Sequence, residues 1–155
     1  MSANKSPVGR VDARVEVAAA AEKVFAAATD WPRQGEWMLG TSVRVRSGDG
    51  RSVGSELQAV TGILGVGVTD SMRITVWDAP TRCEVAHTGR VIRGKGIFQV
   101  HPRGRDRAIF TWTELLDLPA GGVGALAWPL IRPAVSWGLH RSLERFAEFC
   151  RNYPG

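Results

Sequence analysis

Apolar and polar residues alternate strictly near the start of the chain. Between positions 11 and 17, valine and alanine occupy every second position, with a charged residue between each two, and this two-residue period predicts a half-buried strand. The alanine-rich segment 18–28 that follows predicts a helix. Pro32 ends this helical stretch, because a residue that precedes proline avoids the helical conformation. The apolar residues 37–39 predict one or two further helical turns.

The middle of the chain has the pattern of a β-meander. Runs of branched apolar residues alternate with polar ones and are separated by turn-forming Gly, Pro, Ser and Asp residues, as in Ser47–Gly50 and Asp78–Pro80. Six strands are predicted here, one that begins at residue 42 and five at about 54–61, 67–77, 82–88, 90–100 and 107–117. Strands joined by short turns pair antiparallel, so we expect one curved antiparallel sheet.

The last part of the chain predicts a long amphipathic helix. After a break at 118–122, apolar residues recur at spacings of three and four, the period of one helix face. This stripe consists of Trp128, Ile131, Val135, Leu139, Leu143, Phe146 and Cys150. Proline in a helix interior removes a hydrogen bond and clashes with the preceding turn. Pro129 and Pro133 therefore predict a short helix or loose turn over 123–131 and a long helix from Pro133 to Asn152.

Together these elements predict an α+β fold in which a curved antiparallel sheet packs against one long helix. The chain has 155 residues, of which 44% are hydrophobic and 23% charged, which suits one globular core. We expect a single domain over 11–152, preceded by a flexible stretch over 1–10. The sequence contains neither an N-terminal secretory signal nor an apolar run of about 18 residues that could span a membrane. A cytoplasmic location is therefore expected.

Metal and cofactor chemistry has little support in the sequence. Cys83 and Cys150 are the two cysteines, and without a secretory signal they are expected to be free thiols. The histidines, His87, His101 and His140, lie far apart and lack the spacing of metal ligands. We expect no metal site and no cofactor.

The chain is basic, with a formal net charge of +5. Basic proteins often bind nucleic acid, but the arginines of this chain are spread along its whole length. Their one cluster, Arg103 to Arg107, surrounds a predicted turn. We therefore favour a solvated basic surface and expect no nucleic-acid partner.

The stretch His87 to Val100, HTGRVIRGKGIFQV, allows two interpretations. A glycine-rich basic loop could cradle a phosphate, but such a loop leads into the N-terminus of a helix. Gly94 and Gly96 instead lie within a predicted strand and face inward. Glycine weakens a strand interior, and three explanations stay open: a bend in the sheet, space for the large neighbour Trp112, and space for a ligand.

The predicted hairpins can be compared through their registers, because a slip of one residue moves every side chain to the other face. A two-residue turn at 88–89 pairs His87 with Arg90. A turn centred on residue 104 pairs Phe98 with Phe110. Matching the apolar face of the preceding strand then places His87 near Met72. The three turns give one continuous apolar face, with a solvated face behind it.

Four polar residues fall on this apolar face, namely Asp70, His87, Arg90 and Glu114. A buried charge without a partner costs roughly several kcal/mol, so each of them needs a partner, water or a ligand. The first three are expected near one another, either as a structural ion-pair cluster or as the polar mouth of a ligand site. Glu114 either anchors a ligand or acts as a general acid or base, with its pKa raised by burial, or a local bulge turns it to solvent.

Three parts of the chain are similar to a known family. They are VEVAAAAEKVFAAATDWPRQGEW, the segment TGRVIRGKGIFQVHPRG with the following AIFTWTELLDLP, and the closing RSLERFAEFCR. In pattern and order, residues 11–151 resemble the START-like (SRPBCC) superfamily, and within it the bacterial polyketide cyclase/dehydrase and lipid-transport-like proteins. The resemblance implies a helix-grip fold, in which a seven-stranded sheet wraps around the C-terminal helix and encloses a hydrophobic cavity. Members bind lipids, sterols, polyketides or other apolar molecules, and some catalyse cyclisation or dehydration. They share few catalytic residues, so the resemblance assigns none here.

The leading hypothesis is therefore binding or carriage of a small hydrophobic or amphipathic ligand, lipid-, sterol- or polyketide-like, in the cavity. The alternative is a polyketide cyclase- or dehydratase-type enzyme with Glu114 as the candidate catalytic residue. Binding of nucleic acid or of an anionic surface through the arginines ranks last. A monomer or a homodimer is expected. The residues predicted to contact the ligand are Trp37, Met38, Asp70, Met72, Ile74, Val85, His87, Arg90, Ile92, Gly94, Gly96, Phe98, Phe110, Trp112, Glu114, Trp128, Ile131, Val135 and Leu139.

Overall fold

The computed structural model describes residues 8–63, 66–90, 92–118 and 123–154. Its strands are β1 (Val8–Val17), β2 (Thr41–Ser47), β3 (Glu56–Ile63), β4 (Val66–Asp78), β5 (Arg82–Thr88), β6 (Arg93–Pro102) and β7 (Ala108–Asp117). Its helices are α1 (Ala21–Ala28), the 3₁₀ helix η1 (Trp31–Glu36) and α2 (Val123–Asn152). The predicted strand 90–100 thus begins three residues late. Residues 8–10 belong to β1 and not to a flexible stretch, and residues 1–7 of that prediction lie outside the described residues.

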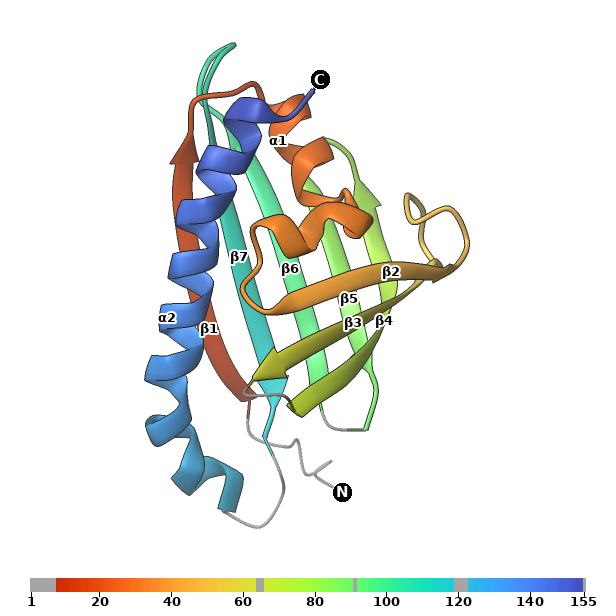
Figure 1. The fold of residues 1–155 in the computed structure, drawn as a ribbon, viewed down its shortest axis with the longest axis vertical. Coiled ribbons are helices and arrows are strands. Elements are labelled where there is room, and N and C mark those ends of the chain that lie inside the picture. Colours follow the sequence, from red (N-terminus) through yellow and green to blue (C-terminus); the bar gives the residue numbers. More distant parts are fainter. Residues whose placement is uncertain (1–7, 64–65, 91, 119–122, 155) are drawn as a thin grey trace, which may run out of the picture.

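The strands form one seven-stranded antiparallel sheet in the order β1-β7-β6-β5-β4-β3-β2. The first two strands therefore lie at opposite edges, and α1 and η1 connect them. Figure 1 shows α2 running along the β1 side of the sheet, while β2 and β3 curl over from the other side. The predicted α+β class, curved antiparallel sheet and long C-terminal helix are confirmed.

Two of the predicted hairpin registers can be compared directly with the sheet. Met72 pairs with His87 across β4 and β5, as predicted. In the β6–β7 hairpin, Phe98 pairs with Trp112 and not with Phe110. This prediction is wrong by two residues, because the turn is centred on residue 105 and not on residue 104. Since the shift is even, the side chains predicted to face inward still do so.

The connection between β5 and β6 departs further from the prediction. His87 pairs with Gly94, and Arg90 has no strand partner among the described residues. Strand β5 ends at Thr88 and β6 begins at Arg93, so the connection is longer than a two-residue turn. Arg90 lies in this loop and is exposed, and its predicted place on the inner face is therefore wrong.

Helix α2 is continuous through Pro129 and Pro133, so the predicted break is wrong. Both prolines are exposed, and water can therefore hydrate the carbonyl groups that lose their helical partners. Within the described part of the chain, no helix is long and apolar enough to cross a membrane.

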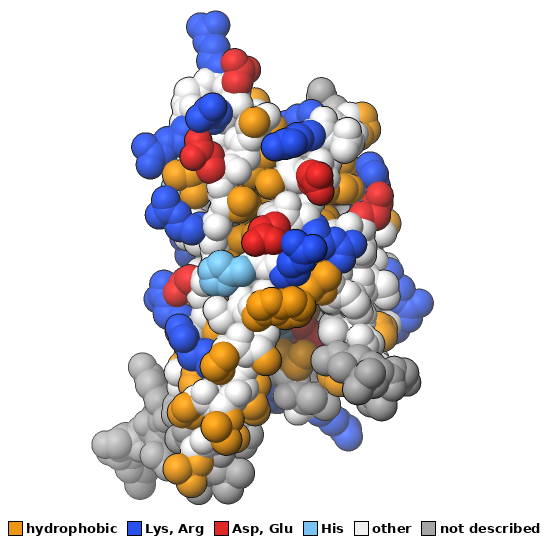
Figure 2. Space-filling model, turned by 60° about the vertical axis from the view of Figure 1, so that its left-hand side comes forward, with side chains coloured by type: hydrophobic (Ala, Val, Ile, Leu, Met, Phe, Trp, Pro, Cys, Tyr) orange, Lys and Arg blue, Asp and Glu red, His pale blue; other side chains and the backbone are white. Residues whose placement is uncertain are grey.

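The first half of α2 is more exposed than its apolar stripe predicts. Trp128 packs on Gly9 of β1, but Ile131 is 51% exposed and Leu130 is 83% exposed. Figure 2 shows apolar side chains gathered along this part of the helix. The reason is that α2 packs here along one edge strand, β1, which covers a narrow strip of the helix surface.

An aromatic core fills the space between the second half of α2 and the sheet. The ring of Phe146 lies 4.7 Å from that of Trp37 and 4.6 Å from that of Phe110, measured between centroids. All three side chains are fully buried. This packing fixes the second half of α2 against the sheet.

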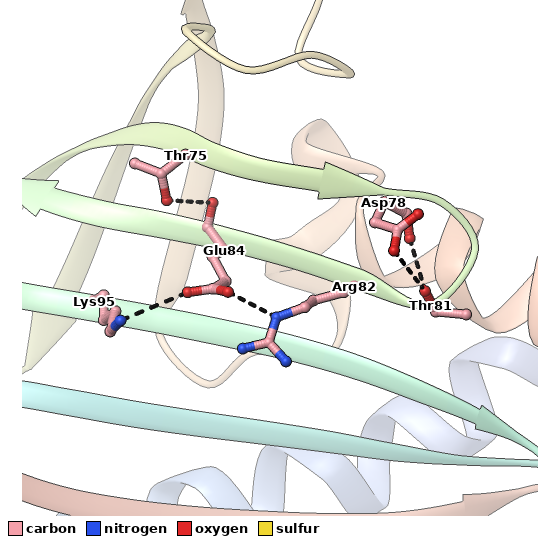
Figure 3. Close-up of polar contacts among 6 residues, drawn as sticks. All are labelled: Thr75, Asp78, Thr81, Arg82, Glu84 and Lys95. Carbon is pink, nitrogen blue, oxygen red and sulfur yellow. Dashed lines mark hydrogen bonds and ion pairs between the residues drawn. The ribbon is translucent and has the colours of Figure 1, made fainter.

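The outer face of the sheet is polar. Figure 3 shows the Glu84 carboxylate of β5 accepting a hydrogen bond of 2.7 Å from Arg82, with the Lys95 ammonium of β6 3.7 Å away. Thr75 donates a hydrogen bond to the Glu84 carbonyl. Near the turn, Thr81 donates to the Asp78 carbonyl. Along β5, the charged residues Arg82 and Glu84 of the outer face thus alternate with Cys83, Val85 and His87, which face inward.

Candidate ligand-binding site

A cavity of about 360 Å³ lies between the inner face of the sheet, η1 and α2. Most of the side chains around it are apolar. The described residues that line it are Trp31, Gln34, Met38, Leu39, Thr41, Val43, Ala59, Thr61, Asp70, Met72, Cys83, Val85, His87, Ile92, Gly96, Phe98, Trp112, Glu114, Leu116, Val135, Gly138, Leu139 and Ser142.

The structure brings most of the predicted contact residues to this cavity. They are Met38, Asp70, Met72, Val85, His87, Ile92, Gly96, Phe98, Trp112, Glu114, Val135 and Leu139. Glu114 faces the cavity, so the predicted alternative of a bulge that turns it to solvent does not occur. Most of these side chains come from β4, β5, β6, β7 and α2, and the even register shifts are the reason that they remain together.

Other predicted contact residues do not line the cavity. Trp37, Ile74 and Phe110 are fully buried in the core, where neighbouring side chains surround them. Arg90 and Ile131 are exposed. The prediction that Arg90 and Ile131 line the cavity is wrong, because Arg90 lies in a loop and Ile131 lies on an uncovered helix face.

Gly94 and Trp128 are also not among the described residues of the cavity wall. Gly94 has a φ of 120°, and a Cβ there would lie 2.0 Å from the Leu115 carbonyl oxygen. It therefore lets β6 approach β7 closely. Trp128 packs instead against Gly9, where a Cβ would lie 2.6 Å from its ring.

The lining residues that sequence reasoning missed come mainly from η1, β2, β3 and α2. They include Gln34, Thr41, Val43, Ala59, Thr61, Gly138 and Ser142. Most of these side chains are small or polar and give no apolar signal. Extending the register comparison to the β2–β3 hairpin, where Val43 pairs with Ala59, would have found part of this wall.

Three ionisable side chains form one connected centre in the cavity wall. The His87 Nδ1 atom lies 2.8 Å from Asp70 Oδ2, and its Nε2 atom lies 2.9 Å from Glu114 Oε2. Their side chains are 5%, 10% and 14% exposed, in the order His87, Asp70, Glu114. The predicted polar cluster therefore exists, with Glu114 in the place expected for Arg90. Because a carboxylate stands where an arginine was expected, the net charge of the cluster is more negative than predicted.

The glycines of β6 make this centre possible. Strand β6 lies between β5 and β7, so His87 and Glu114 meet across it. Gly96 pairs with Glu114 on one side and with Val85 on the other. A Cβ on Gly96 would lie 3.1 Å from Glu114 Oε1 and 3.3 Å from Val85 Cγ2. The missing side chain thus gives the Glu114 carboxylate the space to turn toward His87.

The hydrogen bonds of the centre leave one acceptor free. Trp112 donates from Nε1 to Glu114 Oε1 at 2.9 Å, so both oxygens of Glu114 have a partner. Asp70 Oδ2 accepts from His87, while Asp70 Oδ1 is buried and has no partner among the described residues. A buried acceptor without a partner is uncommon.

The environment of His87 favours its charged form. Burial lowers the pKa of the imidazole, but the hydrogen bonds and negative charges of Asp70 and Glu114 outweigh this effect and raise it to about 10. At neutral pH the ring therefore donates from both nitrogens. Neither nitrogen is left to ligate a metal ion, and the described residues contain no group of His, Cys, Asp and Glu arranged to hold one.

The sequence profile of the family described as polyketide cyclase / dehydrase and lipid transport matches residues 8–150. The chain belongs to this family. A comparison with curated proteins finds no match. The predicted resemblance to polyketide cyclase/dehydrase and lipid-transport proteins is confirmed.

Solved structures of other proteins show the same fold. The protein TTHA0849 from Thermus thermophilus is 18% identical, with a TM-score of 0.78 over 92% of this chain and 97% of that chain. Zhui aromatase/cyclase from Streptomyces sp. R1128 is 17% identical, with a TM-score of 0.74 over 94% of both chains. A START superfamily protein from Mycobacterium smegmatis is 19% identical, with a TM-score of 0.64 over 90% of this chain and 92% of that chain. The helix-grip prediction is thereby confirmed.

In this member of the polyketide cyclase / dehydrase and lipid transport family, the polar centre can do two things chemically. An imidazolium held between two carboxylates is a fixed array of charges that can orient a polar group of a ligand. It can also move a proton, because His87 links two acids through short hydrogen bonds.

Proposed function

We propose that the protein binds a small amphipathic molecule in the cavity. The apolar body of this molecule packs against the sheet and α2, and its polar end contacts the Asp70–His87–Glu114 centre. The observation that carries the proposal is the hydrogen-bonded Asp70–His87–Glu114 centre, whose three residues line a largely apolar cavity. Ligand sites combine an apolar wall with a few placed polar groups in the same way.

The size of the cavity limits which ligands can fit. A volume of about 360 Å³ is near the lower end of the range for small-molecule sites, which is about 300–1,000 Å³. A compact ring system or a short chain fits this volume better than a lipid with two long acyl chains. Membership of a family that includes polyketide cyclases and lipid-transport proteins supports the same class of ligand.

Gly138 offers a direct test of binding. It lies in α2, lines the cavity, and a Cβ there would meet nothing within 4 Å. Gly138→Leu should therefore fill the cavity without displacing the core. We expect loss of binding of the neutral dye Nile red, together with a gain in stability of about 0.5–1 kcal/mol from removal of a helical glycine.

Gly138→Ala is the matched control, because it makes a similar change in helix propensity and adds only one methyl group. It should keep most of the Nile red binding. Mass spectrometry of organic extracts of the purified protein would identify a carried molecule. Equal dye binding by Gly138→Leu and the parent protein would exclude the cavity as the binding site.

A second candidate function is acid–base catalysis of a cyclisation or dehydration. The observation that favours it is the continuous hydrogen-bonded path from Asp70 through His87 to Glu114 inside the cavity. Structural similarity to an aromatase/cyclase supports the candidate. The test is turnover of a linear poly-β-keto thioester. A His87→Gln variant that still binds Nile red but no longer turns over this substrate would support catalysis. Turnover at the rate of the parent protein would exclude a catalytic role for this hydrogen-bonded path.

A further inference from the structure

The net charge of the polar centre follows from its hydrogen bonds. Each of the two contacts made by His87, to Asp70 and to Glu114, joins a ring nitrogen to a carboxylate oxygen, and each needs one proton. Two protons on His87 give an imidazolium between two carboxylates. One proton on His87 and one on a carboxyl group give a neutral ring, an acid and a carboxylate. The sum of charges is minus one in both cases.

No described residue in the cavity wall balances this charge. Those that line the cavity include no Lys and no Arg. Arg90, which the sequence placed beside His87, is exposed in the β5–β6 loop. The neighbouring donor Trp112 Nε1 is already bonded to Glu114. The centre therefore presents a negative charge to the cavity.

We infer that the cavity selects ligands whose polar end donates hydrogen bonds or carries a positive charge, such as a primary ammonium, a hydroxyl or a phenol, and rejects carboxylates, sulfates and phosphates. The inference rests on the proposed function, since it describes which polar end the cavity takes. A donor forms a hydrogen bond with a carboxylate of the centre, and a cation also balances the buried charge. An anionic end would instead be brought against a like charge with little water to screen it.

Three probes of matched shape test this selection. They are 2-(1-naphthyl)ethylamine, 2-(1-naphthyl)ethanol and 1-naphthaleneacetate, with binding measured by calorimetry at pH 7. We expect the amine and the alcohol to bind at least about tenfold more tightly than the acetate. Equal or tighter binding of the acetate would overturn the inference and leave the proposed function intact. Failure of all three probes, together with failure of Nile red, would contradict the proposed function itself.

Two substitutions separate the charge from the acceptor. Asp70→Asn removes the negative charge and replaces a carboxylate oxygen by an amide donor, so the preference for amine and alcohol over acetate should collapse. Glu114→Gln removes the charge but leaves the Asp70 carboxylate and an amide oxygen as acceptors. Here the amine should lose affinity while the alcohol retains it. Unchanged selectivity in both variants would overturn the inference.

Glu84→Gln is the control for net charge. Glu84 lies on β5, on the opposite face from His87, where it pairs with Arg82 and Lys95 (Figure 3). The substitution changes the charge of the protein by the same amount but outside the cavity. We expect the binding of all three probes to be unchanged. A loss of selectivity as large as that of Glu114→Gln would mean that the overall charge, and not the centre, selects the ligand.

Discussion

Gly94 lies directly against the backbone of Leu115, so that a Cβ at position 94 would lie 2.0 Å from the Leu115 carbonyl oxygen. The φ of Gly94 is 120°, a conformation that residues with a side chain rarely adopt. Close approach and backbone conformation together require glycine here. The strand that separates His87 from Glu114 is therefore held close to β7.

Gly94→Ala should destabilise the protein strongly. The added methyl group must either push β6 away from β7 or force a change in φ, and we expect the free energy of unfolding to fall by about 3 kcal/mol or more. Gly104→Ala is the matched control, since Gly104 has a φ of 81° but a Cβ there meets nothing within 4 Å. It should cost about 1 kcal/mol. Urea denaturation of both variants measures the difference, and equal losses would show that close approach contributes nothing.

His87 should make the stability of the protein depend on pH above neutrality. Burial lowers the pKa of the ring, but Asp70 and Glu114 raise it to about 10 from a reference of 6.5. A folded-state pKa above the unfolded value means that protonation stabilises the fold. This contribution is complete below about pH 6.5 and is lost as the pH rises toward 10.

The comparison of the parent protein with His87→Gln isolates this effect. We expect the difference in their free energies of unfolding to decline between about pH 6.5 and 10 in urea titrations. Nitrogen chemical shifts of the His87 ring should show both nitrogens protonated at pH 8. Parallel stability profiles for the two proteins over this range would contradict the assigned charge state.

The aromatic core should be far more sensitive to truncation than the exposed part of α2. Phe146 is fully buried between Trp37 and Phe110, and Phe146→Ala should lower the free energy of unfolding by about 3–5 kcal/mol. Leu130 on the same helix is 83% exposed, and Leu130→Ala should change it by less than about 0.5 kcal/mol. Thermal denaturation followed by circular dichroism distinguishes the two. A large loss for Leu130→Ala would mean that this face is covered in solution.

The two cysteines should react slowly with thiol reagents in the native state. Burial raises the pKa of Cys83 and of Cys150 to about 12, so few thiolates form at pH 8. We expect reaction with Ellman's reagent to accelerate by about a hundredfold or more on unfolding in urea. Cys83 lines the cavity, and its rapid modification in the folded protein would show that the cavity admits reagents as bulky as this one.

Much of the fold followed from local patterns. The alternation of apolar residues and the turn residues between them predicted which side chains face inward. They could not predict which residue pairs with which, because that depends on the conformation of each turn. Phe98 meets Trp112 across a turn that is centred one residue later than the pattern of turn residues indicated. The pattern therefore predicted the correct face and an incorrect register.

The candidate site was predictable only where its residues lie on that face. Asp70, His87 and Glu114 stood out as polar residues among apolar ones, and the structure joins all three. Arg90 was misplaced because the β5–β6 loop is longer than a two-residue turn. Thr41 and Ser142 were missed, since they reach the cavity only through the curvature of the sheet and the position of α2, which no local pattern reveals.

The sheet order has a consequence for synthesis of the protein on the ribosome. In the described sheet β1 lies at an edge and pairs with β7, its partner residues running from Val17 with Ala108 to Val8 with Asp117. At about 5–20 residues per second, β1 is synthesised roughly 5–20 s before its partner strand. Glu114 belongs to the same late segment, and α2 follows it. The cavity wall is therefore incomplete until β7 and α2 have been synthesised.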